Sequence, residues 1–353
     1  MSLQKSDRLI VGAAAVLSVA AAVLNYSKAP HVATFIVSGS GLAALAALVG
    51  RSVEQVADRL GSGATGVLQS ALGNLPELFV CIFALREGLV RVVEAAIIGS
   101  ILSNVLLVLG LAFVVGGLRN GRQAFDANRA RTLVALMILA VAAMLVPSLA
   151  SYVHSPAAPH ERALSVITSV VLLAVFAVSV PSSLRRGEGE ADAEHEHDAA
   201  LWPVPVAIGS LAVTGVLAAF VSDWFVAALQ PSLTSLHISQ AFAGLVIVAI
   251  AGNAVENVVG IQLAARGRAD HALSVILNSP LQIALVLAPV LVLASPLIGG
   301  PAFTLAFPPL LVTTVVASVL AVSFVIIDGE YDWLEGAALF GLYAVVAASF
   351  WWG

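Results

Sequence analysis

Two glutamates, Glu77 and Glu256, stand inside long apolar segments of the chain, and each follows an asparagine by three residues, Asn74 and Asn253 respectively. Residues three apart lie on the same face of a helix, so each glutamate shares a face with its asparagine. An ionised carboxylate within a bilayer costs at least ~2.5 kcal/mol. No lysine or arginine lies inside an apolar segment to pair with these acids. The sequence therefore predicts that a proton or a bound cation neutralises them.

The segments that follow each glutamate add neutral polar side chains. They are Ser100, Ser103, Asn104, Asn278, Ser279 and Gln282. Two carboxylates surrounded by neutral oxygens suit Ca²⁺, and less readily Mg²⁺ or Mn²⁺. The sequence contains no His/Cys cluster that would suit zinc or copper. In the alternative interpretation, the glutamates are protonated packing contacts and the Ser and Asn side chains are interhelical hydrogen bonds.

Residues that loosen a helix stand beside both glutamates. Gly73 and Gly252 each precede the asparagine, and Pro76 precedes Glu77. Proline removes a backbone donor, which leaves a carbonyl one turn earlier without its helical bond. Helices interrupted near the midplane of a membrane expose carbonyl oxygens that can coordinate cations. We therefore predict a helix interruption at Gly73, Pro76 and Gly252.

The composition places these residues in a membrane. Of 353 residues, 60% are hydrophobic and 10% charged, against ~25% charged in a soluble domain. Runs near ~20 apolar residues predict transmembrane helices rather than barrel strands. We predict an all-α integral membrane protein with about eleven such helices: Leu9–Leu24, Val32–Val49, Ala64–Leu85, Val92–Leu118, Thr132–Val153, Ala163–Leu184, Leu201–Val221, Ile238–Ala265, Ala269–Ala294, Phe303–Ile327 and Trp333–Trp352.

The lysines and arginines between these helices predict the orientation, because cytoplasmic loops carry an excess of them. With the N-terminus inside, twelve are cytoplasmic: Lys5, Arg8, Arg51, Arg59, Arg119, Arg122, Arg129, Arg131, Arg185, Arg186, Arg266 and Arg268. Four lie outside: Lys28, Arg86, Arg91 and Arg162. We expect an integral protein of a prokaryotic inner membrane, with a cytoplasmic N-terminus and an outer C-terminus. No basic face for nucleic acid is present, and the sequence makes no prediction of oligomeric state.

An internal repeat relates the two glutamates. Shifting the chain by 179 residues places Gly73–Glu77 on Gly252–Glu256, Ser100 on Ser279 and Leu106 on Leu285. The predicted division is an N-terminal segment with the first helix (1–30), a five-helix repeat (31–184), an acidic cytoplasmic linker (185–200) and a second five-helix repeat (201–353). Because five is odd, the second repeat enters the membrane from the opposite side, which is the inverted construction of many secondary transporters.

At these residues the sequence resembles the calcium/proton exchanger family of the calcium/cation antiporter superfamily. The first repeat reads GNLPELFVCIFALREG and then GSILSNVLLVLGLAFVVGG. The second reads GNAVENVVGIQLAARGR and then NSPLQIALVLAPVLVL, and DGEYDWLEGAALFGLY is similar to the closing segment of the family. The resemblance runs from about Arg51 to the C-terminus.

The resemblance implies an antiporter that exchanges Ca²⁺ for H⁺ by alternating access and exports cytoplasmic calcium without a cofactor. Glu77 and Glu256 would bind Ca²⁺ with Asn74 and Asn253 on the same faces. The cation and proton pathway would include Ser100, Ser103, Ser279 and Gln282. Two departures concern proton coupling and ion selectivity: Asn257 stands where the family often has His, and Asn278-Ser279-Pro280 where Gly-Ser-Ser is usual.

Three alternatives to this function remain open. A monovalent Na⁺ or K⁺/H⁺ antiporter on the same fold is the nearest, and an intramembrane enzyme is more distant. The only acidic cluster outside the linker, Asp328, Glu330, Asp332 and Glu335, has no histidine nearby, so we do not expect an enzyme. A cation channel is disfavoured by inverted repeats.

The acidic linker supports two interpretations. Six of its residues are acids: Glu188, Glu190, Asp192, Glu194, Glu196 and Asp198. With His195 and His197 they suggest a segment that senses cytoplasmic calcium or protons. A solvated, flexible linker is the alternative.

Overall fold

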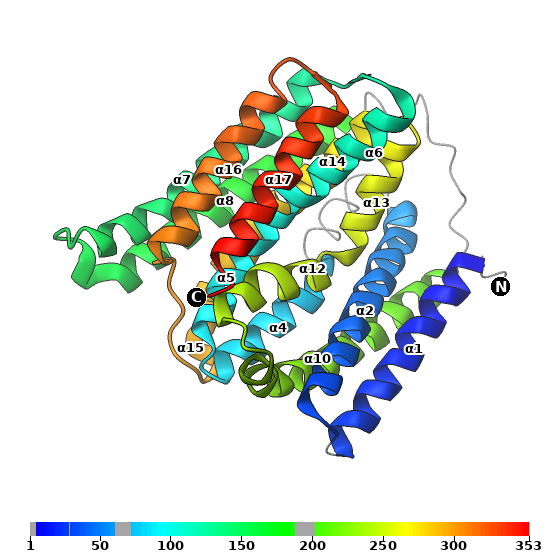
Figure 1. Ribbon diagram of the computed structural model, residues 1–353, viewed down its shortest axis with the longest axis vertical. Coiled ribbons are helices and arrows are strands. Elements are labelled where there is room, and N and C mark those ends of the chain that lie inside the picture. Colours follow the sequence, from blue (N-terminus) through cyan, green and yellow to red (C-terminus); the bar gives the residue numbers. More distant parts are fainter. Residues whose placement is uncertain (1–4, 28, 61–71, 188–201, 353) are drawn as a thin grey trace. The chain divides into compact units, whose positions relative to one another are not determined.

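The computed structural model describes residues 5–27, 29–60, 72–187 and 202–352, which are mainly α-helical (Figure 1). The elements in chain order are α1 (Lys5–Tyr26), α2 (His31–Leu60), α4 (Leu75–Arg86), α5 (Val90–Leu102), the π-helical turn η1 (Ser103–Val108), α6 (Leu109–Asn120), β1 (Gln123–Ala124), α7 (Ala127–Tyr152), the short 3₁₀ turn η2 (Ala158–His160), α8 (Glu161–Gly187), α10 (Val204–Leu236), α11 (Gln240–Phe242), the π-helical turn η3 (Ala243–Val248), α12 (Ala249–Gly252), α13 (Ala254–Ala265), α14 (Ala269–Gln282), the π-helical turn η4 (Ile283–Leu287), α15 (Ala288–Ile298), α16 (Pro309–Val325), β2 (Glu330–Tyr331) and α17 (Trp333–Ser349). The predicted all-α membrane class is confirmed in its coarse form.

Within the described residues, seven helices are long and apolar enough to cross a membrane. An eighth candidate is a pair, Gln240–Gly252 and Glu256–Ala265, bent by 65° at its break. The apolar helices α16 and α17 have 17 residues each, which is about 26 Å of helix. The predicted number of eleven therefore stays a prediction.

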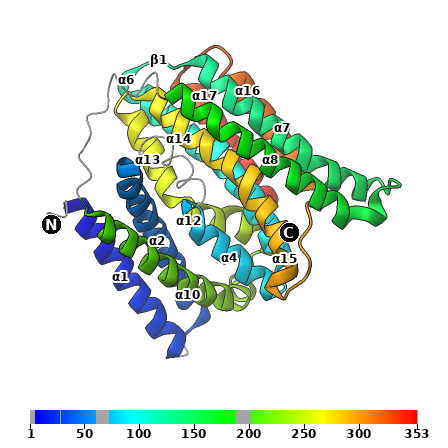
Figure 2. The ribbon, with the colours of Figure 1, turned by 180° about the vertical axis from the view of Figure 1, so that it is seen from behind.

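The chain divides into two compact units. The first comprises Met1–Phe83, Ala174–Leu236 and Ala251–Val255. Its centre is a pair of long helices, α2 and α10, with α1 packed beside them, as Figures 1 and 2 both show. Phe35 of α2 stacks on Phe225 of α10 with ring centroids 4.9 Å apart.

Helix α2 continues past Val49, where the predicted membrane span ends, through polar residues to Leu60. Asp7 of α1, which is 1% exposed, pairs with the Arg51 Nε at 2.9 Å. The Asp7 carboxylate also accepts from the Trp202 Nε1 at 3.2 Å. The Gln55 Oε1 accepts from the backbone N–H of Trp202 at 3.0 Å. Partners distant in sequence thus satisfy the polar end of α2 and allow the helix to continue.

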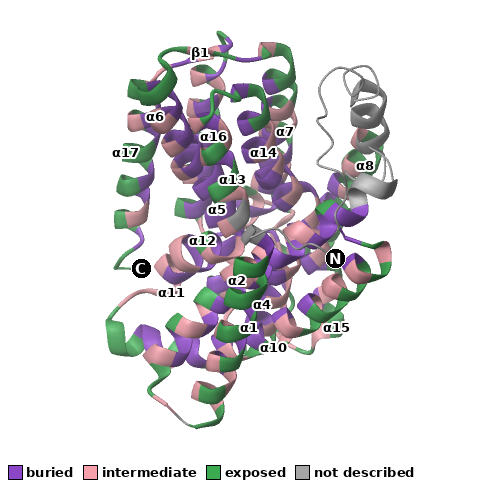
Figure 3. Ribbon diagram, turned by 90° about the vertical axis from the view of Figure 1, so that its right-hand side faces the viewer, coloured by how far each residue is buried: buried purple, intermediate pink, exposed green. Residues whose placement is uncertain are grey.

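The second unit comprises Ala84–Leu173, His237–Ile250 and Glu256–Gly353. Helix α5 lies at its core, since ten of its 13 residues are buried (Figure 3). It packs against η3 without space for side chains: a Cβ on Gly99 would lie 2.4 Å from the Leu245 backbone, and one on Gly244 2.4 Å from the Val92 carbonyl oxygen. Glycine is therefore required on the surface of α5 and on the facing surface of η3.

The far end of the same unit joins α6 to α17. Strands β1 and β2 form a two-stranded antiparallel ladder that pairs Gln123 with Tyr331 and Ala124 with Glu330. The Tyr331 ring stacks on Phe113 of α6 at a centroid distance of 4.0 Å. Burial raises the pKa of Tyr331 to about 12, so its hydroxyl stays protonated at neutral pH.

The helix boundaries repeat along the chain with the spacing found in the sequence. Helices α4 and α13 begin 179 positions apart, at Leu75 and Ala254, and end 179 positions apart, at Arg86 and Ala265. Helices α5 and α14 begin with the same spacing, and η1 and η4 end with it. The turns before α5 and α14 contain Gly88 and Gly267 at φ +75° and +73°. The same local backbone is thus built twice.

Candidate functional site

Each glutamate lies just after a turn that precedes a helix. A turn at Gly73-Asn74 precedes α4, and a turn at Asn253 separates α12 from α13. Glu77 and Glu256 are both the third residue of the helix that follows. Backbone N–H groups of a first helical turn lack helical partners, and the positive end of the helix dipole favours an anion there. The backbone therefore makes both positions favourable for a carboxylate.

The sequence around the first break explains its geometry. The Asn74 carbonyl accepts the bond from the Leu78 N–H at 2.9 Å and so begins the new helix. Pro76 is the second residue of α4, where its missing N–H removes no helical hydrogen bond. Gly73 lies in the turn, outside the helix.

Within the first unit, Glu77 meets the second repeat. Its side chain is 1% exposed. A Cβ on Gly252 would lie 3.3 Å from the Glu77 Cβ and 3.5 Å from its carboxyl carbon. Asn253 is fully buried and Asn74 is 8% exposed. The structure thus places the carboxylate of the first motif against the backbone of the second, which glycine keeps free of a side chain.

Glu256 has a different setting. It belongs to the second unit, and its side chain is partly exposed. The neighbouring Asn257, one of the two departures from the family pattern, has a buried Oδ1 atom without a hydrogen-bond partner among the described residues.

The predicted pathway residues of the second unit form a buried polar contact between the repeats. The Asn104 Nδ2 donates to the Ser100 carbonyl at 2.9 Å and to the Ser279 Oγ at 3.4 Å. The Ser103 Oγ donates to the same Ser100 carbonyl at 3.2 Å. Ser100, Ser103 and Asn104 are fully buried and Ser279 is 4% exposed. The structure therefore brings Ser100, Asn104 and Ser279 together.

Two predicted pathway residues lie apart from this contact. The Asn278 Nδ2 donates to the carbonyl and the Oγ of Ser274. Gln282 is partly exposed and ends α14 at the start of η4. Ser274 was not predicted, although it lies four residues before Asn278, a spacing that places both on one helical face.

The π-helical turns η1 and η4 begin beside these residues, at Ser103 and Ile283. A π-helical turn bonds its carbonyls five residues ahead, which widens the helix and is common at functional sites. Because η1 and η4 occupy equivalent places in the two repeats, this widening is also built twice.

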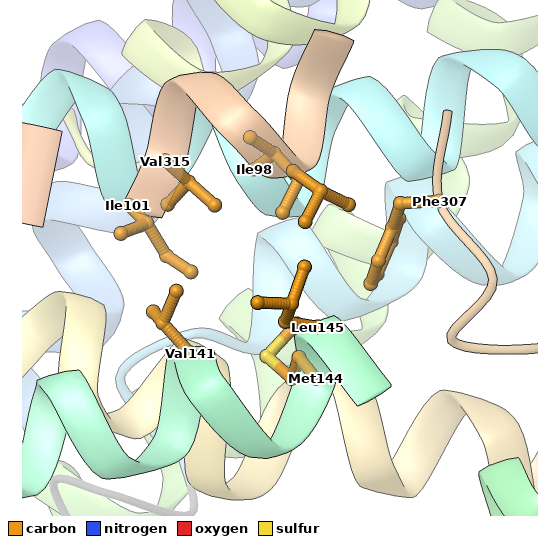
Figure 4. Close-up of a pocket in the computed structure, with 8 residues that line it drawn as sticks. Ile98, Ile101, Val141, Met144, Leu145, Phe307 and Val315 are labelled. Carbon is orange, nitrogen blue, oxygen red and sulfur yellow. The ribbon is translucent and has the colours of Figure 1, made fainter. Parts of the chain in front are cut away.

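No group of three or more His, Cys, Asp and Glu side chains that could hold a metal ion occurs in the part of the chain that the structure describes. A small cavity in the second unit is apolar, as the close-up in Figure 4 shows. It is lined by Ile98, Ile101, Val141, Met144, Leu145, Phe307, Val312 and Val315. A cavity without oxygen ligands cannot hold Ca²⁺, so the glutamate motifs remain the candidate cation site.

The acidic residues 188–198 lie outside the described residues.

Apolar helices, with a carboxylate at the third residue of α4 and of α13 in the two repeats, define a membrane-embedded helical protein of the cation-transporter class. The chain belongs to the sodium/calcium exchanger protein family, which matches residues 30–184 and 206–352.

Similar proteins agree with this family. The Ca(2+)/H(+) antiporter ChaA of Bacillus subtilis is 32% identical and covers 97% of both chains. The Ca(2+)/H(+) antiporter of Synechocystis is 34% identical over 90% of each. The vacuolar calcium ion transporter of Schizosaccharomyces pombe is 34% identical over 90% of this chain and 78% of its own.

Two solved structures are similar. Native YfkE has a TM-score of 0.82 and 30% identity, and the alignment covers 97% of this chain and 98% of that one. The H+/Ca2+ exchanger CAX has a TM-score of 0.77 over 98% of this chain and 92% of its own, with 15% identity, and it shows the fold alone.

Proposed function

We propose that this chain is a secondary active antiporter that exchanges Ca²⁺ for H⁺ and exports cytoplasmic calcium. The observation that carries the proposal is the pair of glutamates, Glu77 and Glu256, each the third residue after an equivalent helix break. The names of the similar full-length proteins, Ca(2+)/H(+) antiporters, support the choice of ions.

The proposed site contains only oxygen ligands. Glu77 and Glu256 bind Ca²⁺, Asn74 and Asn253 lie on the same faces, and carbonyls of the interrupted backbone at Gly73 and Gly252 complete the shell. The neutral side chains that line the pathway are Ser100, Ser103, Asn104, Asn278, Ser279 and Gln282. Ca²⁺ is the transported substrate, and no cofactor or catalytic residue is part of the proposal.

Coupling follows from competition at this site. Ca²⁺ binds when both glutamates are deprotonated, and protons displace it by neutralising them. Both occupied forms are neutral, whereas the empty site carries two negative charges and is costly to move through hydrocarbon. Only loaded forms therefore reorient, which makes the exchange obligatory.

The proposed topology has eleven transmembrane helices: an additional N-terminal helix, α1, and two inverted repeats of five, 31–184 and 201–353, joined by the linker 185–200. The seven long helices, the bent pair, α16, α17 and α4 with the residues before it would account for the eleven. The excess of lysine and arginine supports a cytoplasmic N-terminus and an outer C-terminus in a prokaryotic inner membrane.

The decisive experiment measures Ca²⁺ flux driven by a pH gradient in proteoliposomes. Glu77→Gln and Glu256→Gln should abolish the flux, and Glu94→Gln, which changes another acid near the start of a candidate span, should retain it. Transport at the wild-type rate in either site variant would overturn the assignment. Competition by Na⁺ and K⁺ in the same assay tests the monovalent-cation alternative.

The acidic linker is proposed to sense cytoplasmic calcium or protons through Glu188, Glu190, Asp192, Glu194, Glu196 and Asp198. Deleting residues 188–198 should change the calcium dependence of transport. An unchanged dependence would favour a simple connecting segment.

A further inference from the structure

A polar stripe runs along α14, and only its last two members belong to the pathway predicted from the sequence. Asp270, Ser274, Asn278 and Gln282 follow one another at intervals of four residues. This spacing keeps them along one slowly winding face of the helix. Asp270 is exposed and the other three are partly exposed, whereas most other residues of α14 are buried. A candidate membrane span thus has one hydrophilic face, from its first turn to η4.

Hydrogen bonds connect this stripe to α7, which packs beside α14 (Figure 3). The Arg129 Nη2 of α7 donates to the Ser274 Oγ at 3.1 Å. The Asn278 Nδ2 donates to the same Oγ at 3.3 Å. The stripe begins at Asp270 in the first turn of α14, which we call its mouth. There the Asp126 N–H donates to the Asp270 Oδ1 at 2.6 Å. The Ser274 hydroxyl therefore accepts hydrogen bonds from Arg129, which lies outside the stripe, and from Asn278, the next residue of the stripe.

The equivalent face of α5 is closed by packing rather than hydrophilic. The residues 179 positions earlier are Arg91, Ala95, Gly99 and Ser103. Ala95 and Gly99 are buried, and the Gly99 surface packs directly on the Leu245 backbone. Small residues seal this face against η3, so the first repeat has no counterpart of the hydrophilic face.

We propose that the α14 stripe is the water-accessible route from the α7–α14 surface toward the cation site, and that Arg129 is a positively charged filter on it. Asp270 attracts cations to the mouth, and the guanidinium on Ser274 opposes their passage. The inference rests on the proposed exchange of Ca²⁺. It adds Arg129, Ser274 and Asp270 as specificity-determining residues that do not bind the ion at the transport site.

The physical basis is Coulombic. A single positive charge about 10 Å from a divalent cation in a largely aqueous setting changes cation occupancy about threefold to fourfold. Salt weakens the effect, because a wet route is screened by the surrounding ions. A purely structural tie between α7 and α14 would show neither a salt dependence nor an effect confined to one membrane face.

The first test measures water access. In a Cys81→Ala background, Ser274→Cys and Asn278→Cys should react with a membrane-impermeant thiol reagent added at the α7–α14 face. Ala95→Cys, at the position equivalent to Ser274 in the first repeat, is the matched control and should not react. Equal protection of Ser274→Cys and Ala95→Cys would overturn the route.

The second test measures the filter. Arg129→Gln should lower the KM for Ca²⁺ about threefold at the α7–α14 face at low salt, with kcat unchanged and the difference lost at high salt. Arg129→Lys should resemble the wild type, and Asp270→Asn should raise the KM. If Arg129→Gln leaves the KM for Ca²⁺ unchanged while Glu256→Gln still abolishes exchange, the filter is overturned and the proposed function stands. Exchange retained in Glu256→Gln would instead overturn the proposed function.

Discussion

The two repeats share a backbone and differ in the side chains that line it. Both have a turn just before the helix that carries the glutamate, both contain a positive-φ glycine before the next helix, and both widen that next helix into a π-helical turn. Yet Glu77 is 1% exposed while Glu256 is partly exposed. One face of α5 is closed by packing against η3, whereas the equivalent face of α14 is hydrophilic. The repeat places a carboxylate at two equivalent backbone positions. The neighbouring side chains then make the surroundings of the two carboxylates different.

The largest difference between the two repeats is expected when each glutamate is shortened and keeps its charge. Glu77→Asp should reduce Ca²⁺ exchange about a hundredfold, because the buried carboxylate, fixed against Gly252, loses a contact worth about 3 kcal/mol. Glu256→Asp should be less severe, since its partly exposed setting allows adjustment. The measurement is the initial rate of pH-driven Ca²⁺ uptake. Equal losses in the two variants would contradict the difference between the sites.

The next effect concerns the sealed and hydrophilic faces. Gly99→Ala places a methyl group against the Leu245 backbone and should cost about 1–3 kcal/mol, or on the order of 5 °C in Tm. Asn278→Ala, at the equivalent position, should leave Tm nearly unchanged. Thermal unfolding of the two purified variants in detergent provides the comparison, and a stable Gly99→Ala protein would show that α5 and η3 can separate.

A smaller effect is expected where only one repeat has a polar residue. Asn104→Ile copies its counterpart Ile283 and removes the bonds to Ser100 and Ser279. It should raise the KM for Ca²⁺ about tenfold, since a lost buried hydrogen bond costs about 1–3 kcal/mol. Asn104→Gln, which keeps an amide donor, distinguishes the loss of these hydrogen bonds from a change of side-chain shape. An unchanged KM in Asn104→Ile would remove Asn104 from the pathway.

The smallest effect is expected at the contact between the motifs. Gly252→Ala brings a methyl group to 3.3 Å from Glu77 and should displace that side chain slightly. A cost of about 0.5–1 kcal/mol corresponds to a twofold to fivefold lower rate of exchange. Gly209→Ala, on α10 with open space around it, is the control. An unaffected rate in Gly252→Ala would show that Glu77 has room to move.

Much of the fold was predictable because it depends on local chemistry. Long apolar runs predicted the membrane helices, and the repeated Gly-Asn sequences marked the positions where the structure breaks them. The sequence predicted a membrane span that ends at Val49 but not that the same helix continues to Leu60, because the polar residues that extend it are satisfied by Asp7 and Trp202, which are far away in sequence. The role proposed for Arg129 needed the contact of α7 with α14, although the four-residue spacing of Asp270, Ser274, Asn278 and Gln282 was a signal already present in the sequence.

The sequence by itself determined that this is a helical membrane protein with two repeated carboxylate motifs, because hydropathy and the cost of a charge in lipid act on each segment separately. Only the tertiary structure decided which face of each repeat is closed. That depends on whether another backbone approaches within van der Waals contact, as η3 approaches Gly99 of α5. Such an approach is a property of two segments distant in the chain, and no single segment encodes it.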